Sequence, residues 1–77
     1  MVDSKVAPLD REELELYLRR KLRGRISNLH LQAHEGGLIL RGDCTSYHSK
    51  QLAQHALMKA TDRPLIANRI EVRYEND

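Results

Sequence analysis

Residues Gly36-Gly37-Leu38-Ile39-Leu40-Arg41-Gly42-Asp43-Cys44-Thr45-Ser46 decide the fold of this 77-residue chain. Within them, Leu38, Leu40 and Cys44 share one face of a period-2 pattern, which predicts a strand over residues 38–44. A glycine inside a strand often marks a bulge or the close approach of another backbone. We therefore expect one of these two features at Gly42.

The segment before this strand supplies its predicted partner. Leu29, Leu31 and Ala33 alternate with polar residues, and Glu35-Gly36-Gly37 makes a tight connection into the next strand. This arrangement predicts a β-hairpin with one buried face. The solvent-facing side of the sheet is expected to be polar and weakly basic, with His30, Gln32, His34, Ile39, Arg41, Arg69, Glu71 and Arg73.

A helical pattern precedes the hairpin. Asp10 can cap its start and Glu13 can reach back to Asp10, with acidic residues early in the run and basic residues late. Gly24 stands where a C-cap is expected. We predict a helix over about residues 11–23.

A second helical run follows the hairpin. It starts after Thr45 or Ser46, either of which can supply the N-cap, and it ends at Ala60. Its buried stripe is small and apolar, with Ser49 beside it and Leu52 on its flank, and consists of Ala53, Ala56, Leu57 and Ala60. The opposite face carries Tyr47, Gln51, Gln54 and Met58. We expect this helix to pack closely on the sheet through its small residues.

Asp62-Arg63-Pro64 breaks that helix, and residues 65–74 are predicted to form a third strand. Its buried face is expected to carry Ile66, Asn68, Ile70 and Val72. The order α-β-β-α-β predicts one α+β domain in which two helices pack on one face of a three-stranded mixed sheet. We place the domain at residues 9–74, between an N-terminal arm at residues 1–8 and a tail at residues 75–77.

The composition excludes several classes of protein. Thirteen basic and 11 acidic residues give a net charge of +2, which is too small to indicate a nucleic-acid or membrane partner by itself. Cys44 is the single cysteine, so an intrachain disulfide and a cysteine zinc site within the chain are excluded. No segment approaches the roughly 18 apolar residues that span a bilayer. We expect a cytoplasmic protein, or a periplasmic one if a leader has been removed.

The chain resembles the BON domain family, a small bacterial module first described in osmotically induced and nodulation proteins. The family pattern G-x-V-x-L-x-G-x-V-x-S is matched by Gly36, Leu38, Leu40, Gly42, Cys44 and Ser46. Its alanine-rich helix and its ending V-x-N-x-I-x-V are matched by Ala53, Ala56, Ala60, Ile66, Asn68, Ile70 and Val72. The similarity covers about residues 10–73. The resemblance implies a non-catalytic αββαβ module without a cofactor, which associates with phospholipid surfaces or serves as a docking and regulatory domain.

The strongest charge feature lies at the end of the first helix. Five of seven successive residues are basic, namely Arg19, Arg20, Lys21, Arg23 and Arg25. Each such charge can add roughly 1 kcal/mol toward an anionic leaflet. The same charges also complement a helix C-terminus, and Glu15 can pair with Arg19 at i,i+4 spacing. The first hypothesis is weak binding to an anionic phospholipid surface through these five basic residues. A helix fans them around its axis, so only subsets such as Arg19 with Arg23, or Lys21 with Arg25, are expected to project together.

The alternative hypothesis is a protein-interaction or homo-oligomerisation module that uses the outer face of the second helix, with Tyr47, Gln51, Gln54 and Met58. Nucleic-acid binding is disfavoured because the predicted open sheet face has no aromatic side chain at its centre. His30 and His34 lie roughly 13 Å apart along a strand, too far to share one metal ion. With no catalytic set and no phosphate-binding loop, we expect neither enzymatic activity nor a metal or cofactor.

Overall fold

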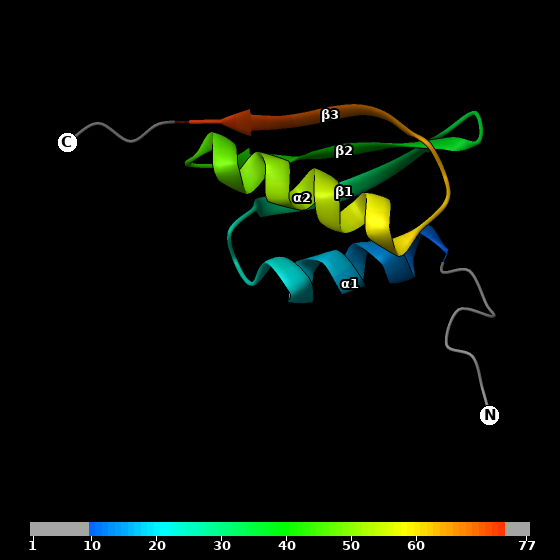
Figure 1. The fold of residues 1–77 in the computed structure, drawn as a ribbon, viewed down its shortest axis with the longest axis horizontal. Helices are drawn as coiled ribbons and strands as arrows, with labels where there is room; N and C mark the ends of the chain where they lie inside the picture. Colours follow the sequence, from blue (N-terminus) through cyan, green and yellow to red (C-terminus); the bar gives the residue numbers. More distant parts are fainter. Residues whose placement is uncertain (1–9, 74–77) are drawn as a thin grey trace.

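The computed structural model describes residues 10–73 and has two layers (Figure 1). The elements, in chain order, are α1 (Arg11–Leu22), β1 (Ser27–His34), β2 (Gly37–Cys44), α2 (Tyr47–Ala60) and β3 (Leu65–Val72). Both helices cover one face of a three-stranded sheet with strand order β1-β2-β3. The β1/β2 pair is antiparallel and the β2/β3 pair is parallel, so the predicted α+β fold with a mixed sheet is confirmed. The predicted arm and tail lie outside the described residues, as does the predicted end of the third strand at position 74.

A two-residue turn joins β1 to β2. Glu35 and Gly36 both have positive φ angles, 49° and 83°, and His34 pairs with Gly37 across them. Positive φ at both central residues gives the turn the twist that matches a hairpin. The connection predicted from Glu35-Gly36-Gly37 is therefore confirmed, with Gly37 already belonging to β2.

The start of β1 is bulged opposite Gly42. The register shifts between the pairs Ser27–Asp43 and His30–Arg41, and the backbone of β1 bends toward β2 there. A Cβ atom on Gly42 would lie 2.6 Å from Cγ2 of Ile26 and 3.1 Å from the Ser27 carbonyl oxygen. The expected bulge and the expected close approach are both present.

A second bulge lies at the start of β3, and it corrects one prediction. Leu38 pairs with Leu65 and Ile39 pairs with Ala67, so Ile66 is an extra residue in β3. Leu65 then takes the position against the core, while Ile66 is 48% exposed. The expectation that Ile66 lies on the buried face is wrong, because unbroken alternation does not hold across a bulge.

The helix ends largely follow the predicted caps. Asp10 and Glu13 form a reciprocal capping box at the start of α1, and the Ser46 hydroxyl accepts a bond from the Ser49 amide at the start of α2. The end of α1 differs from the prediction by one residue. Arg23 itself adopts the left-handed conformation, with φ of 48°, and donates its N–H to the Arg19 carbonyl.

The core lies between the helices and the sheet. Each of the five elements contributes at least one large, fully buried side chain. These are Leu14, Leu18, Leu31, Leu38, Leu40, Leu57 and Ile70. Ala33 was expected on this buried face but is exposed, because the hairpin tip projects past the helices (Figure 1). Ile39 was expected on the solvent side but is only 7% exposed, since it lies on the middle strand between Gln32 and Ala67.

Candidate functional site: a basic groove between the helices

The structure divides the five basic residues predicted as one site. Arg19 turns toward the sheet, where its Nη2 donates to Glu15 Oε2 at 3.0 Å and to the Leu29 carbonyl at 3.0 Å. The i,i+4 pairing of Glu15 with Arg19 is thus confirmed. Arg19 is bound within the domain and does not join the other four basic side chains.

Lys21 and Arg25 line a groove between α1 and α2. Its floor is apolar, with Leu22 from α1 and Leu52 and Ala56 from α2. The groove holds about 240 Å³, below the roughly 300–1,000 Å³ of pockets that enclose a drug-sized ligand. It is therefore an open surface recess that can accept part of a ligand.

Two residues of α2 complete the rim of this groove, and the sequence reasoning missed both. His55 and Lys59 line it from the side opposite Lys21 and Arg25. The two helices run antiparallel (Figure 1), and they are offset, so that the end of α1 lies beside residues 52–59 of α2. We call Lys21, Arg25, His55 and Lys59, with the apolar floor, the basic groove.

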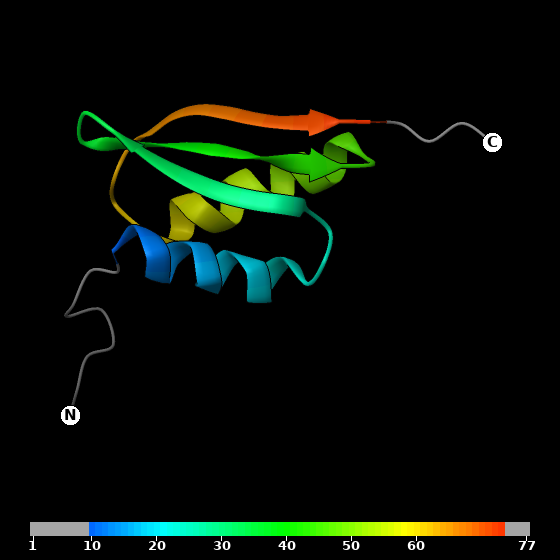
Figure 2. The ribbon, with the colours of Figure 1, turned by 180° about the vertical axis from the view of Figure 1, so that it is seen from behind.

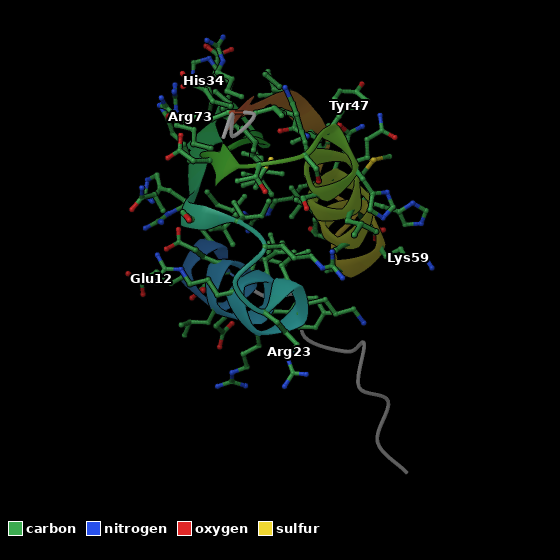
Figure 3. The ribbon with its side chains drawn as sticks, turned by 90° about the vertical axis from the view of Figure 1, so that its left-hand side faces the viewer. Glu12, Arg23, His34, Tyr47, Lys59 and Arg73 are labelled. Atoms are coloured by element: carbon green, nitrogen blue, oxygen red, sulfur yellow. The ribbon has the colours of Figure 1, made fainter. Side chains whose placement is uncertain are left out.

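Arg20 and Arg23 are exposed on α1 outside the groove. Figure 3 shows Arg23 directed away from the domain at the end of α1, and Lys59 on the outer side of α2. Within residues 10–73, none of the ion pairs involves Arg20, Lys21, Arg23, Arg25 or Lys59. Their charges are therefore available to an external anion.

Glu15 is the centre of a cluster that joins α1 to the edge of β1. Its Oε1 accepts the Leu31 N–H at 2.9 Å, and Arg11 Nη1 donates to the Leu31 carbonyl at 3.3 Å. His30 Nδ1 lies 3.2 Å from the same Oε1. We call Arg11, Glu15 and Arg19 the edge clamp, because their side chains bond the backbone of β1 where a further strand would otherwise pair.

Part of the charge on the open face of the sheet is paired internally. Arg73 Nε donates to Asp43 Oδ1 at 3.0 Å, its Nη2 donates to Glu71 at 2.8 Å, and Asn28 donates to Asp43 Oδ2 at 3.2 Å. The Asn28 amide, and after it the Arg73 guanidinium, hold the pKa of Asp43 below its usual value. Figure 3 shows Arg73 and His34 on the side of the sheet away from α2. Within residues 10–73, Arg41 and Arg69 of the same face take part in no ion pair.

The predicted partner face of α2 is present as a surface. Tyr47 and Met58 are 57% and 58% exposed, and Gln51 donates a hydrogen bond to the Tyr47 hydroxyl. Gln54 is engaged differently, since its Oε1 accepts a bond from Asn68 of β3 at 3.1 Å. Asn68 also donates to the Lys50 carbonyl, so the α2 surface is joined to the β3 edge.

Cys44 is buried and donates its thiol proton to the Ser46 carbonyl at 3.1 Å, which fits the small core residue expected at that position. In the part of the chain that the structure describes, no three His, Cys, Asp or Glu side chains gather as a metal site would require. Within the same residues, no helix has the length and apolar character needed to cross a membrane.

Comparison with known proteins adds no assignment: no family model matches this chain, and no curated protein matches it. The resemblance to BON domains therefore rests on the residues quoted above and stays a prediction.

Proposed function

We propose that this chain binds anionic phospholipid surfaces weakly, through the basic groove and the two cations beside it. The observation that carries the proposal is the position of Lys59, which comes from α2 and lines one groove with Lys21 of α1 and with Arg25 of the connection that follows α1. Three cations from different segments surround an apolar floor. The groove therefore offers positive charge for anionic headgroups and apolar surface for the lipid chains beneath them. The resemblance to BON domains points to the same class of ligand.

The magnitude of binding follows from the number of cations. The surface consists of Arg20, Lys21, Arg23, Arg25 and Lys59. At roughly 1 kcal/mol for each cation near an anionic leaflet, the attraction is sufficient for reversible binding and falls as salt screens it. The apolar floor adds little area, so the groove does not anchor the chain firmly.

Co-sedimentation with vesicles tests the proposal. Phosphatidylglycerol vesicles at low salt should pellet the protein, phosphatidylcholine vesicles should not, and about 0.15 M salt should weaken the binding. The triple variant Lys21→Gln/Arg25→Gln/Lys59→Gln should bind about 100-fold more weakly, because it loses about 3 kcal/mol of attraction.

A matched control separates the groove from the net charge. The variant Arg41→Gln/Lys50→Gln/Arg63→Gln removes three positive charges elsewhere and should keep most of the binding. Equal loss in both triple variants would refute the groove as the site. Absence of pelleting by the unmodified protein would refute the lipid function itself.

A second candidate is protein interaction through the outer face of α2. The observation in its favour is that two large side chains of that face, Tyr47 and Met58, are each more than half exposed. Tyr47→Ala and Met58→Ala should then release a captured protein partner that the groove variant still binds. Equal capture by all the variants would count against this face.

A further inference from the structure

The two edges of the sheet are unlike. At the β1 edge, the Leu31 N–H and the carbonyls of Leu29 and Leu31 are bonded by the edge clamp at 2.9–3.3 Å. Side chains of α1 thus occupy the positions that a further strand would use. This edge is closed to strand addition.

The β3 edge has no such cover among residues 10–73, where β2 is the only strand beside it. Figure 2 shows β3 along the upper margin of the sheet. The Arg73 N–H donates to the Cys44 carbonyl of β2 at 2.8 Å, so the odd-numbered residues of β3 face β2. Because residues of a strand alternate between its two neighbours, the backbone groups of Asn68, Ile70 and Val72 face outward.

A single side chain covers part of this edge. Asn68 Oδ1 accepts the Ile70 N–H at 3.1 Å, which confirms that this amide points away from β2. After the bulge at Ile66, β3 contains no proline or further bulge, and its two charged residues, Arg69 and Glu71, have opposite signs, so a second copy can pair with them. The edge is therefore a template for pairing.

We propose that a second copy of this chain binds along this edge, with the two β3 strands antiparallel and Ile70 of each copy on the twofold axis. The outward-facing residues then pair as Ile70 with Ile70 and Asn68 with Val72. Two three-stranded sheets become one sheet of six strands. This inference does not rest on the lipid proposal.

Charge favours this register over its two nearest neighbours. With Ile70 on the axis, Arg69 of each copy lies directly opposite Glu71 of the other, and this pair occurs twice because the interface is isologous. The neighbouring registers that keep outward-facing residues paired place Arg69 opposite Arg69, or Glu71 opposite Glu71. Like charges directly opposite are destabilising, so both neighbouring registers are disfavoured.

The bonds that must change on pairing are few. The Ile70 N–H exchanges Asn68 Oδ1 for a backbone carbonyl of the other copy, while Asn68 keeps its donor bonds to Lys50 and Gln54. Glu71 shares its carboxylate between Arg73 and the facing Arg69. Arg73 remains paired with Asp43 at 3.0 Å.

Sedimentation velocity of the full chain over a range of concentrations tests the proposal. The unmodified protein should form a dimer. Arg69→Glu and Glu71→Arg should each raise the dissociation constant about tenfold or more, because each variant places two like-charged pairs in the interface. An equimolar mixture of the two variants should restore the dimer, because both cross-strand pairs are then opposite in charge.

Other variants locate the contact and check the fold. The variants at positions 69 and 71 should keep the circular dichroism spectrum of the unmodified protein, since both side chains are exposed. Tyr47→Ala and the triple groove variant should dimerise normally. A monomer at about 1 mM, a dimer insensitive to either charge reversal, or a mixture that stays monomeric would each overturn the proposal, whatever the vesicle experiment shows.

Discussion

Gly42 is the residue at which the start of β1 comes closest to β2. Its missing side chain leaves room for Ile26 and for the Ser27 carbonyl on the neighbouring bulge. Gly24 differs, because a Cβ there would meet no atom within 4 Å, although its φ of 85° still disfavours other residues. Gly42 also has a positive φ, 156°, so its requirement is both steric and conformational, whereas that of Gly24 is conformational alone.

Gly42→Ala should lower the free energy of unfolding by about 1–3 kcal/mol, because the added Cβ forces Ile26 and the bulge apart. Gly24→Ala should cost about 1 kcal/mol, from its backbone conformation alone. Urea denaturation of both variants gives the comparison. Equal losses would mean that contact at Gly42 does not limit the fold.

Asp43 gives the stability a pH dependence at the acid end. Its pKa is lowered by the Asn28 amide and by Arg73, so the folded state binds its proton less readily than the unfolded state does. Its contribution is present above the ordinary carboxyl pKa and is lost as the pH falls through the lowered folded value. The stability difference between the unmodified protein and Asp43→Asn should therefore shrink below about pH 4.

Urea midpoints at pH 7 and at several lower pH values measure that difference. Glu12→Gln is the control, because the Glu12 side chain is 80% exposed and its pairing with Arg11 is at 3.9 Å. A stability difference between the unmodified protein and Asp43→Asn that stays constant down to the acid transition would contradict the proposed role of Asp43.

Among the elements, α1 has the most specific attachment to the sheet. Beyond its buried leucines, the edge clamp bonds the backbone of β1 on the outside of the sheet. Packing of an apolar stripe leaves a helix some freedom to slide, whereas hydrogen bonds to particular backbone atoms do not. The clamp therefore sets the position of α1 along β1.

Glu15→Ala should destabilise the domain by about 1–3 kcal/mol, because it leaves the Leu31 amide without its partner and frees both arginines. Glu15→Gln keeps an acceptor oxygen and should lose less. Arg20→Ala is the control, because it changes an exposed residue of the same helix without touching β1. Amide hydrogen exchange at Leu31, together with urea midpoints, measures the effect, and unchanged exchange in Glu15→Ala would contradict the clamp.

The sequence predicted the elements well where local signals exist. The capping box at Asp10, the Ser46 cap and the Glu35–Gly36 turn are each determined by residues within a few positions, and each is confirmed. The bulge at Ile66 was missed because it depends on how β3 aligns with β2, which no neighbouring residue encodes. Alternation alone consequently placed Ile66 on the wrong face.

At the scale of the whole molecule, the core is small. A domain of this size keeps only about 3–5 kcal/mol of net stability from its hydrophobic core. Leu57 of α2 is 1% exposed and packs in the middle of that core. Loss of one such side chain is comparable with the total stability.

Leu57→Ala should therefore leave the domain with at most about 3 kcal/mol of net stability, and unfolded at the upper end of the cost, because truncation of a buried leucine costs about 2–5 kcal/mol. Met58→Ala, the adjacent exposed position, should change little. Circular dichroism at 222 nm and a urea titration measure both variants. A cooperative transition for Leu57→Ala near that of the unmodified protein would show a larger stability than this core implies.

The candidate site depends on how the helices and the sheet pack together. For that reason the sequence could not predict all of the residues that line the groove. Lys21 and Arg25 were expected to project together and both line the groove, although α1 already ends at Leu22. Arg19 and Arg23 were expected to project together as well, but Arg19 bonds to Glu15 and the Leu29 carbonyl, while Arg23 points away from the domain (Figure 3). His55 and Lys59 join the first pair only because α1 and α2 pack antiparallel, and Arg19 leaves the second pair only because the β1 backbone lies within its reach. Neither relation is local in the chain.

The parallel β2/β3 pair also has a consequence for the order of folding. The two-residue turn at Glu35–Gly36 lets β1 and β2 pair after closing a very short loop. Pairing of Leu38 with Leu65 requires closure of a much longer loop that includes α2, so it should form later. We expect β3 to be the last strand to dock. Until then, β2 of one molecule can accept β3 from another, so concentrated refolding should give strand-exchanged dimers that form slowly and separate slowly.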